Sequence, residues 1–94
     1  MRSPEAIETY QAEFDYKWYA YFDLLDFGIK IRVSKKILKI REYPCKRHLK
    51  KSMFFVDEVG QYRIAYRVFE ENELVRFYFV GTHKEYGRWY RQEF

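Results

Sequence analysis

Hydrophobic side chains in the first quarter of the chain recur at steps of three and four residues, which is the spacing of one helical face. Ser3, Pro4 and Glu5 are typical of a helix start, because serine caps free amides and proline fits the first turn. The pattern therefore predicts a helix from about residue 4 to about residue 26, before Gly28. Its apolar stripe consists of Ile7, Tyr10, Phe14, Trp18 (or Lys17), Tyr21 and Leu25.

The segment after Gly28 fits two hydrophobic periods. We favour a second helix that ends at about Glu42 and whose first residue is left open. Pro44 ends it, because the residue before a proline is pushed out of the helical region. Two helices joined near Gly28 would pack as an antiparallel hairpin. The strand-like alternation is that of Ile29, Ile31 and Val33, and the helical spacing is that of Val33, Ile37 and Ile40.

Beyond Pro44 the hydrophobic period changes to two, which indicates strands. We expect strands at 53–57, 61–69 and 74–80, joined as an antiparallel meander, and a short helix from about residue 84 to about residue 91. The architecture is therefore α+β in one domain over residues 1–94, with an N-terminal helical hairpin packed on one face of a small twisted sheet. Arg63 and Arg67 point to the other face, which no expected element covers, opposite the apolar row of Tyr62, Ile64, Tyr66 and Val68.

Charge is distributed unevenly along the chain. Residues 1–27 hold two basic and six acidic side chains, residues 28–51 hold ten basic and one acidic, and residues 52–94 hold six basic and seven acidic. A concentrated basic stretch suits a surface that binds a polyanion, although a solvated lysine-rich helix would have the same composition. The chain is also rich in aromatic residues, with ten Tyr and nine Phe, which can fill a core or stack on bases.

Cysteine and histidine are scarce. Cys45 is the only cysteine, so an internal disulfide and a multi-cysteine metal cluster are excluded. Two histidines without HExxH or CxxC spacing give little support to a metal site, and we expect no metal and no other cofactor. Because the sequence has neither an apolar signal region nor an apolar run of membrane length, we expect a cytoplasmic protein without membrane contact.

Two motifs in the second half of the chain resemble those of the RelE/ParE toxin superfamily, most closely its HigB, YafQ and RelE branches. The motifs are Gln61-Tyr62-Arg63-Ile64-Ala65-Tyr66-Arg67-Val68 and, after an acidic turn and an apolar strand, Val80-Gly81-Thr82-His83-Lys84-Glu85-Tyr86. The resemblance implies the toxin of a type II toxin–antitoxin system. Such a toxin is an endonuclease that cuts messenger RNA on translating ribosomes and is silenced by a cognate antitoxin.

The resemblance also implies a sheet and a set of residue roles. Family members have four strands, the first of which precedes the first helix. No room for it exists before Ser3, so we expect three strands or a truncated start. Arg63 matches the arginine that stabilises the transition state, His83 the general acid, and Tyr86 an aromatic that braces the substrate. The general base is left open among His48, Lys50 and Lys51.

These residue types suit cleavage of RNA without a metal, which needs a base, a cation beside phosphorus and an acid. Arg63 can grip phosphate oxygens, and His83 can donate a proton because free histidine titrates near pH 6.5. Structural roles fit as well: an ion pair of Arg63 with Glu73, His83 as a helix cap, and packing of the last helix through Tyr86, Trp89 or Tyr90. Further contacts to RNA are expected from Lys39, Lys46, Arg47, Lys51, Arg67, Lys84 and Tyr90.

Three functions are compatible with these observations. We favour the ribosome-dependent endoribonuclease, because His83 is expected beside Arg63. The alternatives are a ParE-like inhibitor of DNA gyrase and a noncatalytic module of the same fold that binds RNA or protein. The expected partners of the favoured reading are the ribosome, messenger RNA, and an antitoxin with an acidic, partly disordered segment.

Overall fold

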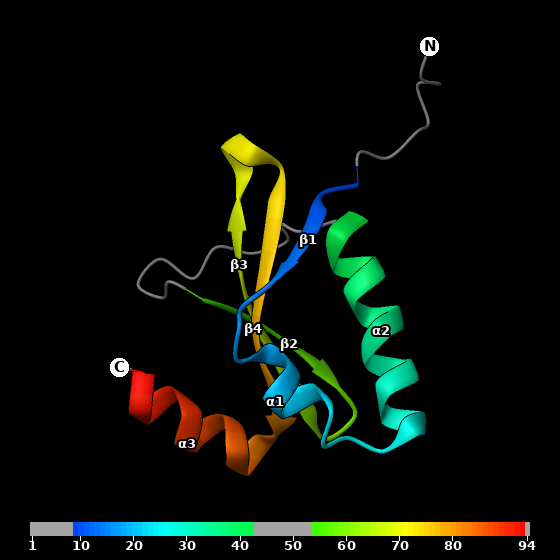
Figure 1. Ribbon diagram of the computed structural model, residues 1–94, viewed down its shortest axis with the longest axis vertical. Helices are drawn as coiled ribbons and strands as arrows, with labels where there is room; N and C mark the ends of the chain where they lie inside the picture. The colour runs from blue at the N-terminus through cyan, green and yellow to red at the C-terminus, as the bar shows by residue number, and fades with distance from the viewer. Residues whose placement is uncertain (1–8, 43–53, 94) are drawn as a thin grey trace.

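A four-stranded sheet with the strand order β1-β4-β3-β2 forms the centre of the molecule (Figure 1). The structure is a computed structural model that describes residues 9–42 and 54–93. β2, β3 and β4 form the expected antiparallel meander, whereas β1 pairs with β4 in parallel. The predicted α+β class is confirmed. The strands are β1 (Gln11–Phe14), β2 (Phe55–Val59), β3 (Tyr62–Phe69) and β4 (Leu74–Thr82), and the helices are α1 (Trp18–Phe22), α2 (Phe27–Glu42) and α3 (His83–Glu93).

The long helix predicted for residues 4–26 is wrong. Residues 1–8 lie outside the described part of the chain, residues 11–14 form β1, and the helix that follows has only five residues. The amide of Gln11 donates to the carbonyl of Glu73, and the amide of Asp15 donates to the carbonyl of Phe77. These bonds satisfy backbone groups that a helix would have paired within its own turns. β1 also gives the sheet the fourth strand that was expected to be missing.

α2 confirms that the segment after Gly28, whose hydrophobic pattern fits both a strand and a helix, is helical. Its inner face packs on the sheet through Val33, Ile37 and Ile40, which are buried in the larger of two apolar clusters. Neither α2 nor another helix of the described ranges is long and apolar enough to span a membrane. The same cluster contains Trp18 of α1, Val59 of β2, Ile64 and Tyr66 of β3, and Val75, Phe77 and Val80 of β4.

A β-bulge in β4 determines which of its residues face α2. The pairing with β3 skips from Phe77 to Phe79, so Tyr78 is an extra residue in the strand. Phe77 belongs to the cluster under α2, whereas Phe79 belongs to a second cluster on the opposite face. There the ring of Phe79 stacks on Trp89 of α3, with ring centroids 5.1 Å apart.

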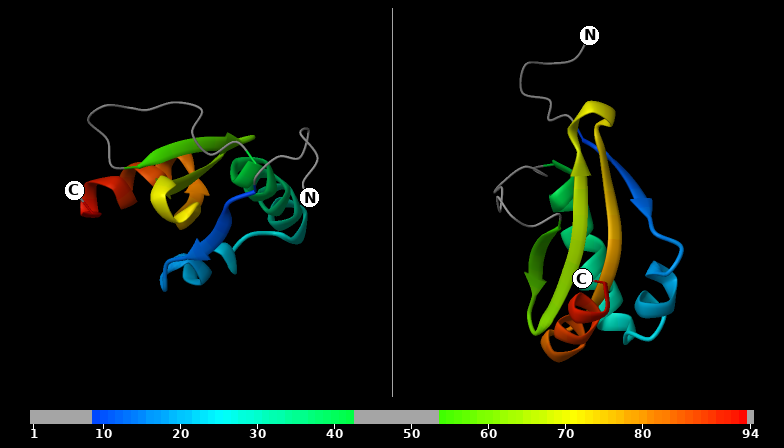
Figure 2. Two further views of the ribbon diagram at one scale, coloured as in Figure 1. Left: turned by 90° about the horizontal axis from the view of Figure 1, so that it is seen from above. Right: turned by 90° about the vertical axis from the view of Figure 1, so that its left-hand side faces the viewer.

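α3 covers part of the sheet face that carries Arg63 and Arg67, so the expectation that this face is uncovered is wrong. In the right-hand view of Figure 2, α3 lies in front of the sheet and α2 behind it. Trp89 is buried between Phe79 and Phe54, as expected for at least one aromatic residue of this helix. The sheet therefore has apolar contacts on both faces.

Candidate active site

Arg63 lies on β3, between two strands that set its surroundings. Its direct neighbours are Glu58 of β2 and Gly81 of β4. Opposed residues on paired strands project to the same face, and Nη2 of Arg63 lies 3.5 Å from Oε2 of Glu58. The ionic partner of Arg63 is therefore Glu58 and not Glu73, which follows the turn at the far end of β3.

A capping box places His83 at the first position of α3. The hydroxyl of Thr82 accepts a hydrogen bond of 3.2 Å from the amide of Glu85, and the Glu85 carboxylate accepts one of 2.8 Å from the amide of Thr82. Thr82 is therefore the cap, and the interpretation of His83 as the cap is wrong. The amide of His83 donates to the carbonyl of Gln61, which ties the start of α3 to the turn between β2 and β3. The Thr-x-x-Glu signal for this cap was present in the sequence and was missed.

Arg63 and His83 line one shallow hollow with a volume of about 350 Å³. Its walls come from the end of β2, the following turn, the start of β3 and the first turn of α3. The hollow thus combines a guanidinium, which can hold a phosphate, with an imidazole, which can transfer a proton. The other lining residues are Glu58, Gly60, Gln61, Thr82 and Lys84.

Tyr86 braces the arginine of this hollow. The guanidinium carbon of Arg63 lies 5.5 Å from the centroid of the Tyr86 ring, within the range of a cation–π contact. Burial raises the pKa of the Tyr86 phenol, and Tyr90 raises it further, while the Arg63 cation acts in the opposite direction. The phenol therefore keeps its proton at neutral pH and can donate a hydrogen bond but cannot serve as a base.

The remaining residues expected to bind RNA are divided between the two faces of the sheet. Lys84 lines the hollow, and the half-exposed ring of Tyr90 lies beside that of Tyr86. Arg67 shares the face of Arg63 but is four residues along β3, a distance of about 13 Å. Lys39 belongs to α2, which covers the opposite face, so the structure does not bring it to the hollow. The residues outside the described ranges are Lys46, Arg47, His48, Lys50 and Lys51.

Glu58 is the residue of the hollow that sequence reasoning missed. The signal was the two-residue turn Gly60-Gln61, because a turn of two residues pairs Val59 with Tyr62 and therefore Glu58 with Arg63. A carboxylate at this place can accept a proton or hold the guanidinium in position. Residues 9–42 and 54–93 contain no group of three or more side chains that could hold a metal ion.

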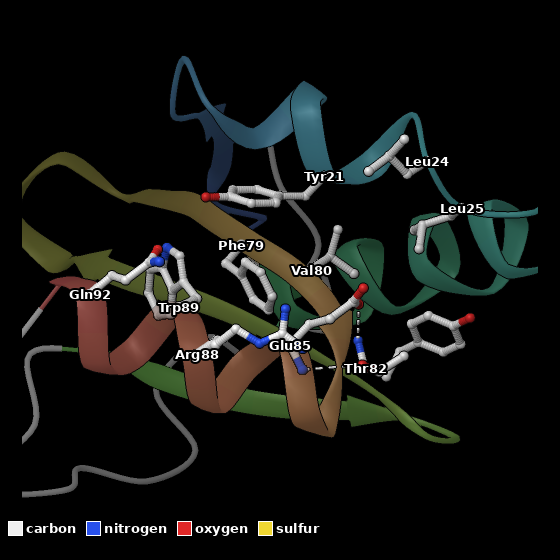
Figure 3. A pocket seen from close by; sticks show the side chains of 11 residues that line it. Tyr21, Leu24, Leu25, Phe79, Val80, Thr82, Glu85, Arg88, Trp89 and Gln92 are labelled. Carbon is white, nitrogen blue, oxygen red and sulfur yellow. Dashed lines mark hydrogen bonds between the residues drawn. The ribbon is translucent and has the colours of Figure 1, made fainter.

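A second cavity, of about 320 Å³, lies on the other side of the start of α3 (Figure 3). Tyr21 of α1 borders it on one side and Trp89 of α3 on the other, with Phe79 of β4 between them. Its carboxylate, Glu85, already accepts the amide hydrogen of Thr82. The cavity contains neither Arg63 nor His83 among its lining residues, so the candidate chemistry belongs to the hollow.

The fold is similar to that of solved toxin structures. A toxin–antitoxin complex RelBE2 from Mycobacterium tuberculosis matches with a TM-score of 0.72 and 18% identity, covering 83% of this chain and 95% of that one. The isolated Escherichia coli RelE toxin matches with a TM-score of 0.69 and 18% identity, covering 90% and 99%. The intact Escherichia coli RelBE complex matches with a TM-score of 0.69 and 20% identity, covering 78% and 95%.

The structure has similar solved structures, whereas the sequence matches no family model and no curated protein. Because the identities are only 18–20%, the likeness to solved structures shows the fold alone. As far as the fold is concerned, it confirms the resemblance drawn from the two motifs. The chain has the fold of the RelE toxins.

Proposed function

We propose that this protein is the toxin of a type II toxin–antitoxin pair and that it cuts messenger RNA on the ribosome without a metal ion. The observation that supports this best is the hollow shared by Arg63 and His83, with the Tyr86 ring against the arginine. The fold supports the toxin class, because the similar structures include RelE bound to its antitoxin RelB. A ribosome-dependent nuclease would act in the cytoplasm.

Arg63, His83 and Tyr86 each have a distinct task in this reaction. Arg63 holds nonbridging phosphate oxygens and offsets the negative charge that develops around phosphorus. His83 is exposed at the start of α3 and gives its proton to the leaving 5′-oxygen, a step that typically contributes about 10²–10⁴-fold. Tyr86 keeps the guanidinium in place. Attack by the 2′-hydroxyl makes RNA, and not DNA, the substrate.

An acidic antitoxin is the partner that this surface favours. α2 carries six basic side chains and one acidic side chain, and Lys35 and Lys39 are exposed on it. A disordered acidic segment can fold against such a helix and neutralise it. Because part of the attraction is electrostatic, its affinity falls as the salt concentration rises.

Translation in a purified system, followed by mapping of the 5′ ends of the message, tests the proposal. The parent protein is compared with Arg63→Ala. The parent should produce discrete cuts within codons on the ribosome, and the variant should cut at least about 10²-fold more slowly because it lacks the charge at phosphorus. An intact message with the parent protein would contradict the proposal. Stalled gyrase would then indicate the ParE-like function, and RNA that is bound but uncut would indicate a noncatalytic module.

A further inference from the structure

Glu58 stands in the hollow on the opposite side of Arg63 from His83. The strand order places β3 between β2 and β4, with Glu58 on β2 and His83 directly after β4. Both residues line the same hollow as Arg63. A phosphate held by the guanidinium would therefore have a carboxylate on one side and an imidazole on the other.

The carboxylate of Glu58 contributes little to the stability of the fold. Its side chain is 66% exposed, and the ion pair with Arg63 spans 3.5 Å. Exposed ion pairs of this kind are weak, because water screens the charges and two long side chains lose freedom. The ion pair can therefore separate when a phosphate binds to Arg63. Its small contribution to the stability of the fold does not explain why a carboxylate is present at this position.

A carboxylate is also unfavourable for simple binding of RNA at this position. Its charge repels the phosphate that Arg63 and Lys84 attract. Glu58 and His83, which both line the hollow, carry a carboxylate and an imidazole, and both side-chain types serve in general acid–base catalysis.

We propose that Glu58 is the general base of the cleavage, an inference that rests on the proposed function. The Glu58 carboxylate takes the proton of the 2′-hydroxyl, and the 2′-oxygen then forms a bond to phosphorus. The bond from phosphorus to the 5′-oxygen breaks, and that oxygen takes the proton of the His83 imidazolium. The products are a 2′,3′-cyclic phosphate and a free 5′-hydroxyl, with one proton accepted and one donated. Attack and departure on opposite sides of phosphorus agree with a base and an acid on opposite sides of Arg63.

Single-turnover cleavage on programmed ribosomes, with Glu58→Gln against the parent, tests this assignment. The matched control is Asp57→Asn, which removes a carboxylate from the neighbouring position of β2, where Asp57 pairs with Lys36 of α2 on the other face. Glu58→Gln should cut at least about 10²-fold more slowly, while its affinity for ribosome-bound message stays equal or becomes tighter. Asp57→Asn should cut at nearly the parent rate.

The pH profile distinguishes a base from a residue that only positions Arg63. The parent rate should fall at acid pH as the base becomes protonated, and this fall should be absent in the residual activity of Glu58→Gln. Glu58→Asp should restore part of the rate. If the parent cuts and Glu58→Gln cuts equally fast, loses only affinity, or keeps the acid-side fall, the assignment of Glu58 is wrong while the nuclease stands. If the parent itself does not cut, both proposals are wrong.

Discussion

Substitution of Gly81 by alanine tests whether the close packing beneath α3 holds the hollow in shape. Gly81 is buried directly opposite Arg63. A Cβ atom added to it would lie 2.7 Å from Cζ of Phe79 and 2.8 Å from Oε1 of Glu85. The Phe79 ring is buried against Trp89, and the Glu85 oxygen accepts the amide hydrogen of Thr82. Neither neighbour can move without loosening the contact of α3 with the sheet or its capping box.

The size of the effect follows from these contacts. Inserting a methyl group into a filled site typically costs about 1–3 kcal/mol. In a domain of this length about 1 kcal/mol lowers Tm by about 5 °C, so Gly81→Ala should lower Tm by about 5–15 °C. Gly28→Ala is the matched control, because no described atom outside its chain neighbours and its own helix lies within 4 Å of the added Cβ. In α2 the same change should stabilise the fold by about 0.4–1 kcal/mol.

Thermal unfolding followed by circular dichroism measures both variants, and single-turnover cleavage at low temperature measures the site. Gly81→Ala should cut more slowly than Gly28→Ala even where both are fully folded, because the start of α3 carries His83. A Tm of Gly81→Ala equal to that of the parent would refute the packing argument. A lowered Tm with an unchanged cleavage rate would refute the link between α3 and the chemistry.

Two further predictions concern the titratable groups. His83→Gln should keep the Tm of the parent yet cut at least about 10²-fold more slowly, as measured in single turnovers, because glutamine cannot donate a proton at neutral pH. Burial raises the pKa of Tyr21 and of Tyr86 above the usual value, so the fold favours the protonated phenols. This stabilisation is complete below the pH at which tyrosines of the unfolded chain ionise and is lost as pH rises through the folded-state pKa values. Thermal unfolding should therefore show Tm falling above about pH 10, and falling less in Tyr86→Phe.

The sequence predicted the meander because its signals are local. β3 alternates between apolar and polar residues, and each of its neighbours is adjacent in the chain. β1 was misassigned because Tyr10 and Phe14 fit a helical stripe as well as a strand. Tyr10, Ala12 and Phe14 also alternate with polar residues, and all three pack on the main cluster. Residues 11–14 form a strand and not a helix because they pair with β4, and their partner residues lie 63 positions further along the chain.

The candidate site could be predicted in part for the same reason. Arg63 and His83 were identified because the motifs fixed their places at a strand and at a strand end. The Phe79 side chain could not be assigned to a face, because the bulge at Tyr78 reverses the alternation of β4 without a sequence signal such as glycine or proline. Because the bulge was not predicted, Phe79 could not be recognised as the residue that supports Trp89. The sheet face of Arg63 and Arg67 was therefore expected to be uncovered.

The bulge in β4 allows apolar side chains of this strand to pack on both faces of the sheet. If β4 alternated without interruption, Phe79 would face α2 together with Phe77, and the next residue to face the arginines would be Val80. The extra residue instead lets Phe77 and Val80 face α2 while Phe79 supports Trp89 on the opposite side. α3 can then pack beside Arg63 and bring the His83 backbone to the turn between β2 and β3. One unpaired position in β4 thus allows a core on each face of the sheet, and the second core holds the helix that carries the proposed acid.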